Sequence, residues 1–138
     1  MALLVGGCAW FRGTLQVDPV VLNEVRGIGA VRGETTVQSD VNRRAEITYF
    51  FVIDVGSGSA RDSLDKAVKT LQSKKWSIMS ENRPIRVLMK SDKWVGVHLT
   101  IAPFDKMYLK EAPELSRVID DQTASTDGLV IIDVYEFA

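Results

Sequence analysis

The side chains that could carry out acid–base or nucleophilic chemistry are few in this sequence. His98 is the single histidine, and general-base catalysis would need a partner such as Asp133 within hydrogen-bond reach. A lone histidine among apolar strand residues is more often a packed side chain. No serine lies in a Gly-x-Ser-x-Gly context, so no hydrolase nucleophile turn is predicted. We therefore expect no catalytic residue, and an enzyme using His98 and Asp133 is kept only as a third hypothesis.

Residue counts also limit the metal and cofactor sites. Cys8 is the only cysteine, so the chain can form neither an intrachain disulfide nor a cysteine–histidine zinc cluster. The segment Gly56–Ser59 lacks the lysine of a phosphate-binding loop. Asp120, Asp121 and Asp127 do not have the spacing of an EF-hand. We expect no metal and no cofactor, although a carboxylate-only site for a hard cation stays open.

Charge argues against a nucleic-acid partner. Seventeen basic and eighteen acidic residues give a net charge of −1, whereas nucleic-acid-binding domains usually carry a clear basic excess. A local basic cluster does exist near Trp76 and Trp94, and it consists of Lys74, Lys75, Arg83, Arg86, Lys90 and Lys93. Because the RNP1 pattern is missing, a solvated face is the simpler interpretation. Beside a membrane, the same cluster could contact anionic headgroups.

The N-terminal residues carry a short motif. Val5-Gly6-Gly7-Cys8 follows an apolar stretch, with an aliphatic residue, two small residues and then a cysteine. This segment resembles the lipobox of bacterial lipoproteins, although it lacks a preceding basic residue and its apolar stretch is short. The resemblance implies that Cys8 is lipidated and that the membrane is a partner. The alternative interpretation is an ordinary cysteine near the terminus.

Hydrophobic periodicity predicts most of the regular elements. Ile47–Val55 is a β-branched and aromatic run, and Ser59 begins a helix with an apolar stripe at Leu64, Ala67, Val68 and Leu71. Two alternating segments, 85–90 and 94–102, predict a β-hairpin. A weaker helix is predicted over 111–121 and a last strand over 129–137. This order predicts an α+β fold, a ferredoxin-like β-α-β-β-α-β sandwich with helices on one sheet face.

The domain organisation follows from these elements. Residues 1–8 would be a signal-peptide remnant or apolar N-terminus, 9–44 a tether that adds edge strands, and 45–138 a single α+β domain. Alternation assigns Val95, Val97, Leu99 and Ile101 to the helix-covered face. The opposite face is too apolar to stay in water, and we expect the segment 15–37 to cover part of it. The candidate binding face comprises Phe50, Val52, Leu88, Trp94, His98, Ile131 and Tyr135.

Two functional hypotheses remain. The first is a non-enzymatic lipoprotein domain, anchored in the cell envelope through Cys8 and facing outward, that binds a protein partner or itself. The second is a cytoplasmic module that binds a small molecule or a peptide on the open sheet face.

Overall fold

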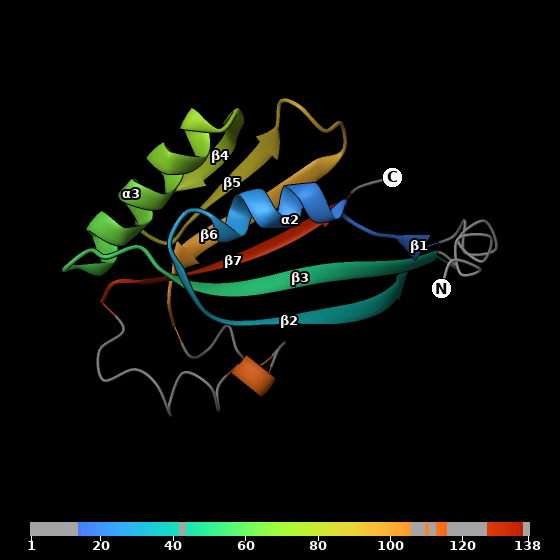
Figure 1. Ribbon diagram of the computed structural model, residues 1–138, viewed down its shortest axis with the longest axis horizontal. Coiled ribbons are helices and arrows are strands. Elements are labelled where there is room, and N and C mark those ends of the chain that lie inside the picture. The colour runs from blue at the N-terminus through green and yellow to red at the C-terminus, as the bar shows by residue number, and fades with distance from the viewer. Residues whose placement is uncertain (1–13, 42–43, 106–109, 111–112, 116–126, 137–138) are drawn as a thin grey trace.

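The protein folds as one mainly antiparallel sheet with two helices packed on it (Figure 1). The computed structural model describes residues 14–41, 44–105, 110, 113–115 and 127–136. The helices within these residues are α2 (Pro19–Arg26) and α3 (Ala60–Ser73). The strands are β1 (Thr14–Leu15), β2 (Ala30–Val41), β3 (Arg44–Asp54), β4 (Trp76–Asn82), β5 (Arg86–Ser91), β6 (Val97–Pro103) and β7 (Leu129–Glu136).

The strand order confirms the α+β class but not the ferredoxin-like topology. The strands follow the order β3-β7-β6-β5-β4, β2 pairs with β3, and the short β1 runs parallel to the start of β3. A ferredoxin-like sheet would place β3 beside β6, whereas here β7 lies between them. The physical reason is the composition of β7, because the run from Leu129 to Ile132 is buried on both faces and therefore fits a central position.

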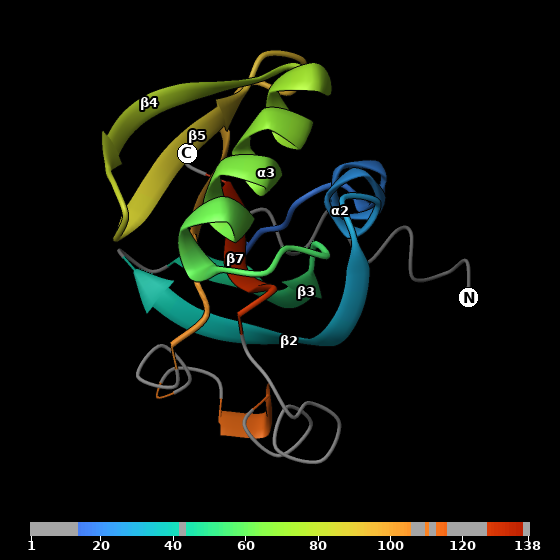
Figure 2. The ribbon, with the colours of Figure 1, turned by 90° about the vertical axis from the view of Figure 1, so that its left-hand side faces the viewer.

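Both helices cover the same face of the sheet (Figure 2). Helix α2 begins after Asp18, whose side chain accepts a hydrogen bond from the Val20 backbone at 2.9 Å, and it buries Val21, Leu22 and Val25. The expectation that the segment 15–37 covers part of the opposite face is therefore wrong for α2, and within that segment Val37 of β2 packs against the apolar cluster on that face. An amphipathic helix needs a partner for its apolar stripe, and α2 finds it in the core beside α3, while β2 extends the sheet as an edge strand.

Helix α3 confirms the prediction made from its cap and stripe. The Ser59 hydroxyl accepts a hydrogen bond from the Asp62 backbone at 3.1 Å, and Leu64, Ala67, Val68 and Leu71 are all buried. The next segment, for which the sequence pattern predicted no strand, is β4. It pairs with β5 and contains an irregularity between Ile78 and Ser80, which disrupts the alternation that would have revealed it.

The opposite face of the sheet is covered only at one end by the described residues. Phe50, Val52, Leu129 and Ile131 form a second apolar cluster with Ala102 and Leu115. Leu115 belongs to the helix predicted over 111–121, of which only 113–115 is described as helical, and the rest lies outside the described residues. Leu115 therefore packs on the face that the predicted helix was not expected to cover.

Candidate functional site

The structure divides the predicted binding face into three parts. Phe50, Val52 and Ile131 are buried with Leu115 in the second cluster. Leu88, His98 and Tyr135 lie on the rest of the same face, where they are half-buried. The remaining member, Trp94, and the neighbouring Val95 lie in the loop between β5 and β6, and Cys8 lies outside the described residues.

The positions of Trp94 and Val95 differ from the predicted alternation. Trp94 packs against the core on the helix side, not on the open face, and Val95 is 98% exposed, although the strand pattern placed it in the core. The reason is the length of the turn, since β6 starts only at Val97. A loop has no fixed alternation, so the pattern that holds within β6 does not extend back to these residues.

A concavity of about 330 Å³ opens on the uncovered part of this face. We call it the open-face pocket, and its lining residues are Ser80, Glu81, Asn82, Arg86, Leu88, Thr100 and Tyr135. Strand pairing builds it, because Leu88 lies between Ser80 of β4 and Thr100 of β6. Neighbouring strands thus place hydroxyl groups on both sides of one apolar side chain.

Tyr135 is the most distinctive polar group in the open-face pocket. Burial raises the pKa of its phenol, a hydrogen bond with Thr100 opposes this, and the charge of Asp133 raises it further. A phenol is neutral at physiological pH already at its ordinary pKa of about 10, and the raised pKa of Tyr135 acts in the same direction, so the hydroxyl takes part in hydrogen bonds without carrying charge. Tyr135 also forms one wall of the pocket, and its ring offers an apolar surface to a ligand.

His98 has the surroundings of a packed side chain. Its ring stacks on that of Tyr135, with centroids 5.9 Å apart and an interplanar angle of 15°. Its Nδ1 lies 3.0 Å from the carbonyl oxygen of Gly96, which orients the ring. These contacts support the interpretation of His98 as an oriented, partly buried residue that shapes the rim of the sheet face.

Two cations near the open-face pocket have no ion pair within the described part of the chain. Arg86 and Lys90 are exposed on β5. Arg83 differs, because it contacts both Glu81 and Asp65. The pairing raises the pKa of Arg83, chiefly through its hydrogen bond to Glu81. Arg86 and Lys90 therefore leave positive charge available for a ligand.

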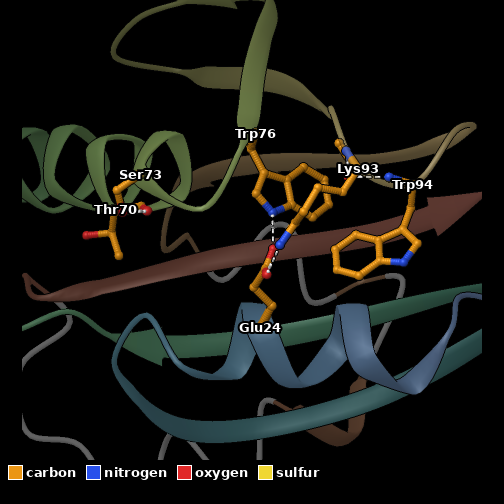
Figure 3. Close-up of polar contacts among 7 residues, drawn as sticks. Glu24, Thr70, Ser73, Trp76, Lys93 and Trp94 are labelled. Carbon is orange, nitrogen blue, oxygen red and sulfur yellow. Dashed lines mark hydrogen bonds and ion pairs between the residues drawn. The ribbon is translucent and has the colours of Figure 1, made fainter.

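A second polar cluster, centred on Glu24, joins α2 to the start of β4 (Figure 3). The two carboxylate oxygens of Glu24 accept hydrogen bonds from Trp76 Nε1 at 3.0 Å and from Lys93 Nζ at 2.7 Å. Lys93 also lies 4.6 Å from the Trp94 ring centroid. The Glu24 side chain is only 15% exposed, so the cluster is a structural junction. Sequence reasoning missed it, because Glu24 and Trp76 are 52 residues apart.

Hydroxyl groups near this junction also serve the fold. Thr70 donates to the Lys66 carbonyl at 2.9 Å, and Ser73 donates to the Thr70 carbonyl at 2.6 Å. Both bonds stay within α3, on which Figure 3 shows Thr70 and Ser73. These residues satisfy the helix's own backbone and offer no arrangement for nucleophilic chemistry.

The turn after β3 is held by Asp54, the last residue of that strand. Its carboxylate accepts a hydrogen bond from the Gly56 backbone at 2.8 Å and lies 3.2 Å from Arg32. The hydrogen bond from Gly56 is the main reason that the pKa of Asp54 is lowered, and Arg32 adds to it. Within the same turn, the Ser59 hydroxyl caps α3. These bonds support the interpretation of the segment 56–59 as a structural turn.

Three further findings concern metal-binding groups, membrane-spanning helices and similarity to known proteins. Asp120 and Asp121 lie outside the described residues, and the residues that are described include no group of three metal-ligating side chains. In that same part of the chain, no helix combines the length and apolarity needed to span a membrane. No family model, curated protein or solved structure matches the chain.

Proposed function

We propose that this chain is a non-catalytic binding domain that receives a protein partner at the open-face pocket, and that lipid on Cys8 anchors it to the membrane of the cell envelope. The observation that carries the binding role is the pocket itself. Its lining combines the apolar side chain of Leu88 with the hydroxyl groups of Thr100 and Tyr135. It also includes Arg86, which has no ion pair with any residue that the structure describes.

The location of the pocket supports this role. Leu115 and its neighbours cover the rest of the same sheet face, so the described residues cover one end of the face and leave the other end uncovered. A binding surface combines apolar area with a few oriented polar groups, and the open-face pocket has both. Catalysis would need an acid–base pair beside a nucleophile, and the contacts of His98 instead fit a packing role.

Photo-crosslinking in cells tests the binding role. A photoreactive amino acid replaces Ser80 at the exposed rim of the pocket, and a control protein carries it at Lys69, which is exposed on α3. We expect a discrete crosslinked product from position 80 and none from position 69. If the two positions give the same products, or if position 80 gives none, the open-face pocket does not bind a protein partner.

The anchor is proposed from the lipobox-like segment Val5–Cys8. One acyl chain gives only marginal membrane binding, so stable anchoring requires more than one. Metabolic labelling with a fatty acid compares the native chain with Cys8→Ser. We expect label on the native chain and its loss in the variant. An unlabelled native chain would contradict the anchor and leave the binding role to be judged by the crosslinks.

The second candidate is a cytoplasmic module that binds a small molecule or a peptide. The observation in its favour is the size of the open-face pocket, since about 330 Å³ falls within the range of small-ligand sites. The two candidates differ in compartment and occupant. An unlabelled chain that remains in the cytoplasm and gives no protein crosslink from position 80 would favour the small-molecule module.

A further inference from the structure

Strand β4 forms one edge of the sheet, and its outer side pairs with no other described strand (Figure 2). An edge strand presents backbone N–H and C=O groups that can pair with another chain. Two large apolar side chains are exposed at this edge, Met79 within β4 and Ile85 in the turn that follows, with exposed fractions of 49% and 50%. The edge therefore combines free backbone groups with apolar surface.

Concavities flank the end of β4. The open-face pocket includes Ser80 and Asn82 of β4. A further concavity of about 300 Å³ is lined by Arg61 and Leu64 of α3, together with Asp65, Arg83 and Pro84. Successive side chains of a strand point to opposite faces of a sheet. A strand added at β4 would therefore direct alternate side chains toward the two concavities.

Charge at this edge is strongly asymmetric. Residues 74–93 hold six basic and two acidic residues, a net charge of +4, whereas the whole chain has a net charge of −1. The local carboxylate of Glu81 is occupied by Arg83. Lys74, Lys75, Arg86 and Lys90 have no ion pair within the part of the chain that the structure describes. This edge therefore complements a negatively charged partner.

We propose that the outer edge of β4 takes up an extended, acidic segment of a partner protein as an additional strand of the sheet. Main-chain hydrogen bonds to β4 supply affinity, and side chains that enter the concavities supply specificity. Acidic side chains of the added segment would contact the positive charges of Arg86 and Lys90, which lie on β5, the strand that pairs with β4. The inference rests on the proposed binding function and specifies its partner and mode. Anionic lipid headgroups would use the charge but neither the strand edge nor the concavities.

A model peptide tests strand addition on the full chain. The probe is a fluorescein-labelled peptide of alternating glutamate and valine, and binding is followed by fluorescence anisotropy. Its matched control has methyl groups on alternate backbone amides, which block pairing along a strand but keep every charge. We expect saturable binding of the probe and at least tenfold weaker binding of the control. Equal binding of the two peptides, or no saturable binding at millimolar concentration, would overturn the proposal.

Charge-reversal variants test whether peptide binding depends on positive charge beside β4 or only on the net charge of the chain. Arg86→Glu with Lys90→Glu removes positive charge beside β4, and Lys66→Glu with Lys69→Glu makes the same change in net charge on α3. We expect the two substitutions on β5 to weaken binding of the probe peptide at least tenfold. The two substitutions on α3 should change its affinity less than threefold. Phosphatidylglycerol vesicles are assayed in parallel. If vesicles bind with the same dependence on Arg86 and Lys90 while the methylated peptide matches the probe, the surface is a lipid site and strand addition is refuted.

Failure of strand addition and failure of the proposed binding function give different results in the peptide and crosslinking experiments. Crosslinks from position 80 together with a probe that fails would leave a binding domain whose partner docks without adding a strand. Absence of crosslinks from position 80 would contradict the proposed binding of a protein partner itself.

Discussion

Glu24 connects three elements through one carboxylate. It accepts hydrogen bonds from Trp76 Nε1, whose side chain is buried, and from Lys93, whose side chain is 43% exposed. The two hydrogen bonds contribute unequally to the free energy of unfolding. A buried donor that loses its acceptor is left without a partner and cannot bind water instead, which costs stability. An exposed ammonium group returns to water at little cost. The stability supplied by Glu24 should therefore depend mainly on Trp76.

Substitution of Glu24 tests this inequality. We expect Glu24→Ala to lower the free energy of unfolding by about 1–3 kcal/mol, since Trp76 Nε1 is left unsatisfied. Lys93→Ala should lower it by less than about 1 kcal/mol. Urea denaturation followed by tryptophan fluorescence measures both. In a Trp76→Phe background the cost of Glu24→Ala should shrink, and an unchanged cost there would refute the role of this hydrogen bond.

Asp54 should make stability depend on acid pH. Its folded pKa is lowered, chiefly by the Gly56 backbone hydrogen bond, so its stabilising contribution is present above the unfolded pKa and is lost as pH falls through the folded pKa. We therefore expect the native chain to lose more stability than Asp54→Asn between about pH 5 and pH 2. Thermal unfolding across this range provides the measurement, and parallel curves for the two proteins would contradict the prediction.

Local sequence signals were enough for residues whose partners are near in the chain. The Ser59 cap was predictable because its bond reaches only to Asp62. The packed character of His98 agrees with the interpretation favoured by its solitary position. Trp94 could not be placed, because the length of the loop before β6 decides its side of the sheet. The Glu24 junction was equally hidden, since it depends on tertiary contacts between distant segments.

At the scale of elements, the connection from α2 to β2 crosses the end of β3 at Gly29. A Cβ atom at this position would lie 2.4 Å from the Asp54 carbonyl oxygen and 2.8 Å from the Ile53 side chain. Both contacts are too short for an unshifted backbone. Glycine is therefore required here for a close approach between two neighbouring strands.

Alanine at two glycines measures this constraint. We expect Gly29→Ala to lower the free energy of unfolding by about 1–3 kcal/mol, because the new methyl group overpacks the strand junction. Gly58→Ala is the matched control, since no atom lies within 4 Å of its added Cβ. Chemical denaturation of both variants provides the comparison. Equal stability of the two would show that the α2–β2 connection can move away from β3.

Periodicity predicted elements better than it predicted their order. The face assignment of β3, the helix α3 and the hairpin of β5 and β6 all follow from alternation or from a 3.6-residue stripe. Strand order is not encoded in alternation, because the same apolar faces allow β7 to lie at the edge or in the centre. In the structure Leu129 to Ile132 are buried on both faces of β7, as a central strand requires.

At the scale of the whole molecule, the fold separates a sealed region from an open one. The helices cover one face, and Leu115 with its neighbours seals one end of the other. The open-face pocket and the basic β4 edge lie together in what remains. The sequence predicted an apolar face that needs cover, but it could not show which part the chain itself covers. That division is what points to a binding surface.

A crosslinking scan over the sheet tests whether the uncovered part of this face binds a partner protein. The photoreactive residue is placed in turn at Ser80 and Arg86 beside the pocket, at Glu114 near the sealed end, and at Lys69 on α3. We expect that the same partner protein is captured from positions 80 and 86, and that positions 114 and 69 give no crosslinked product. Capture from positions 114 or 69 with equal yield, or from neither pocket position, would contradict it.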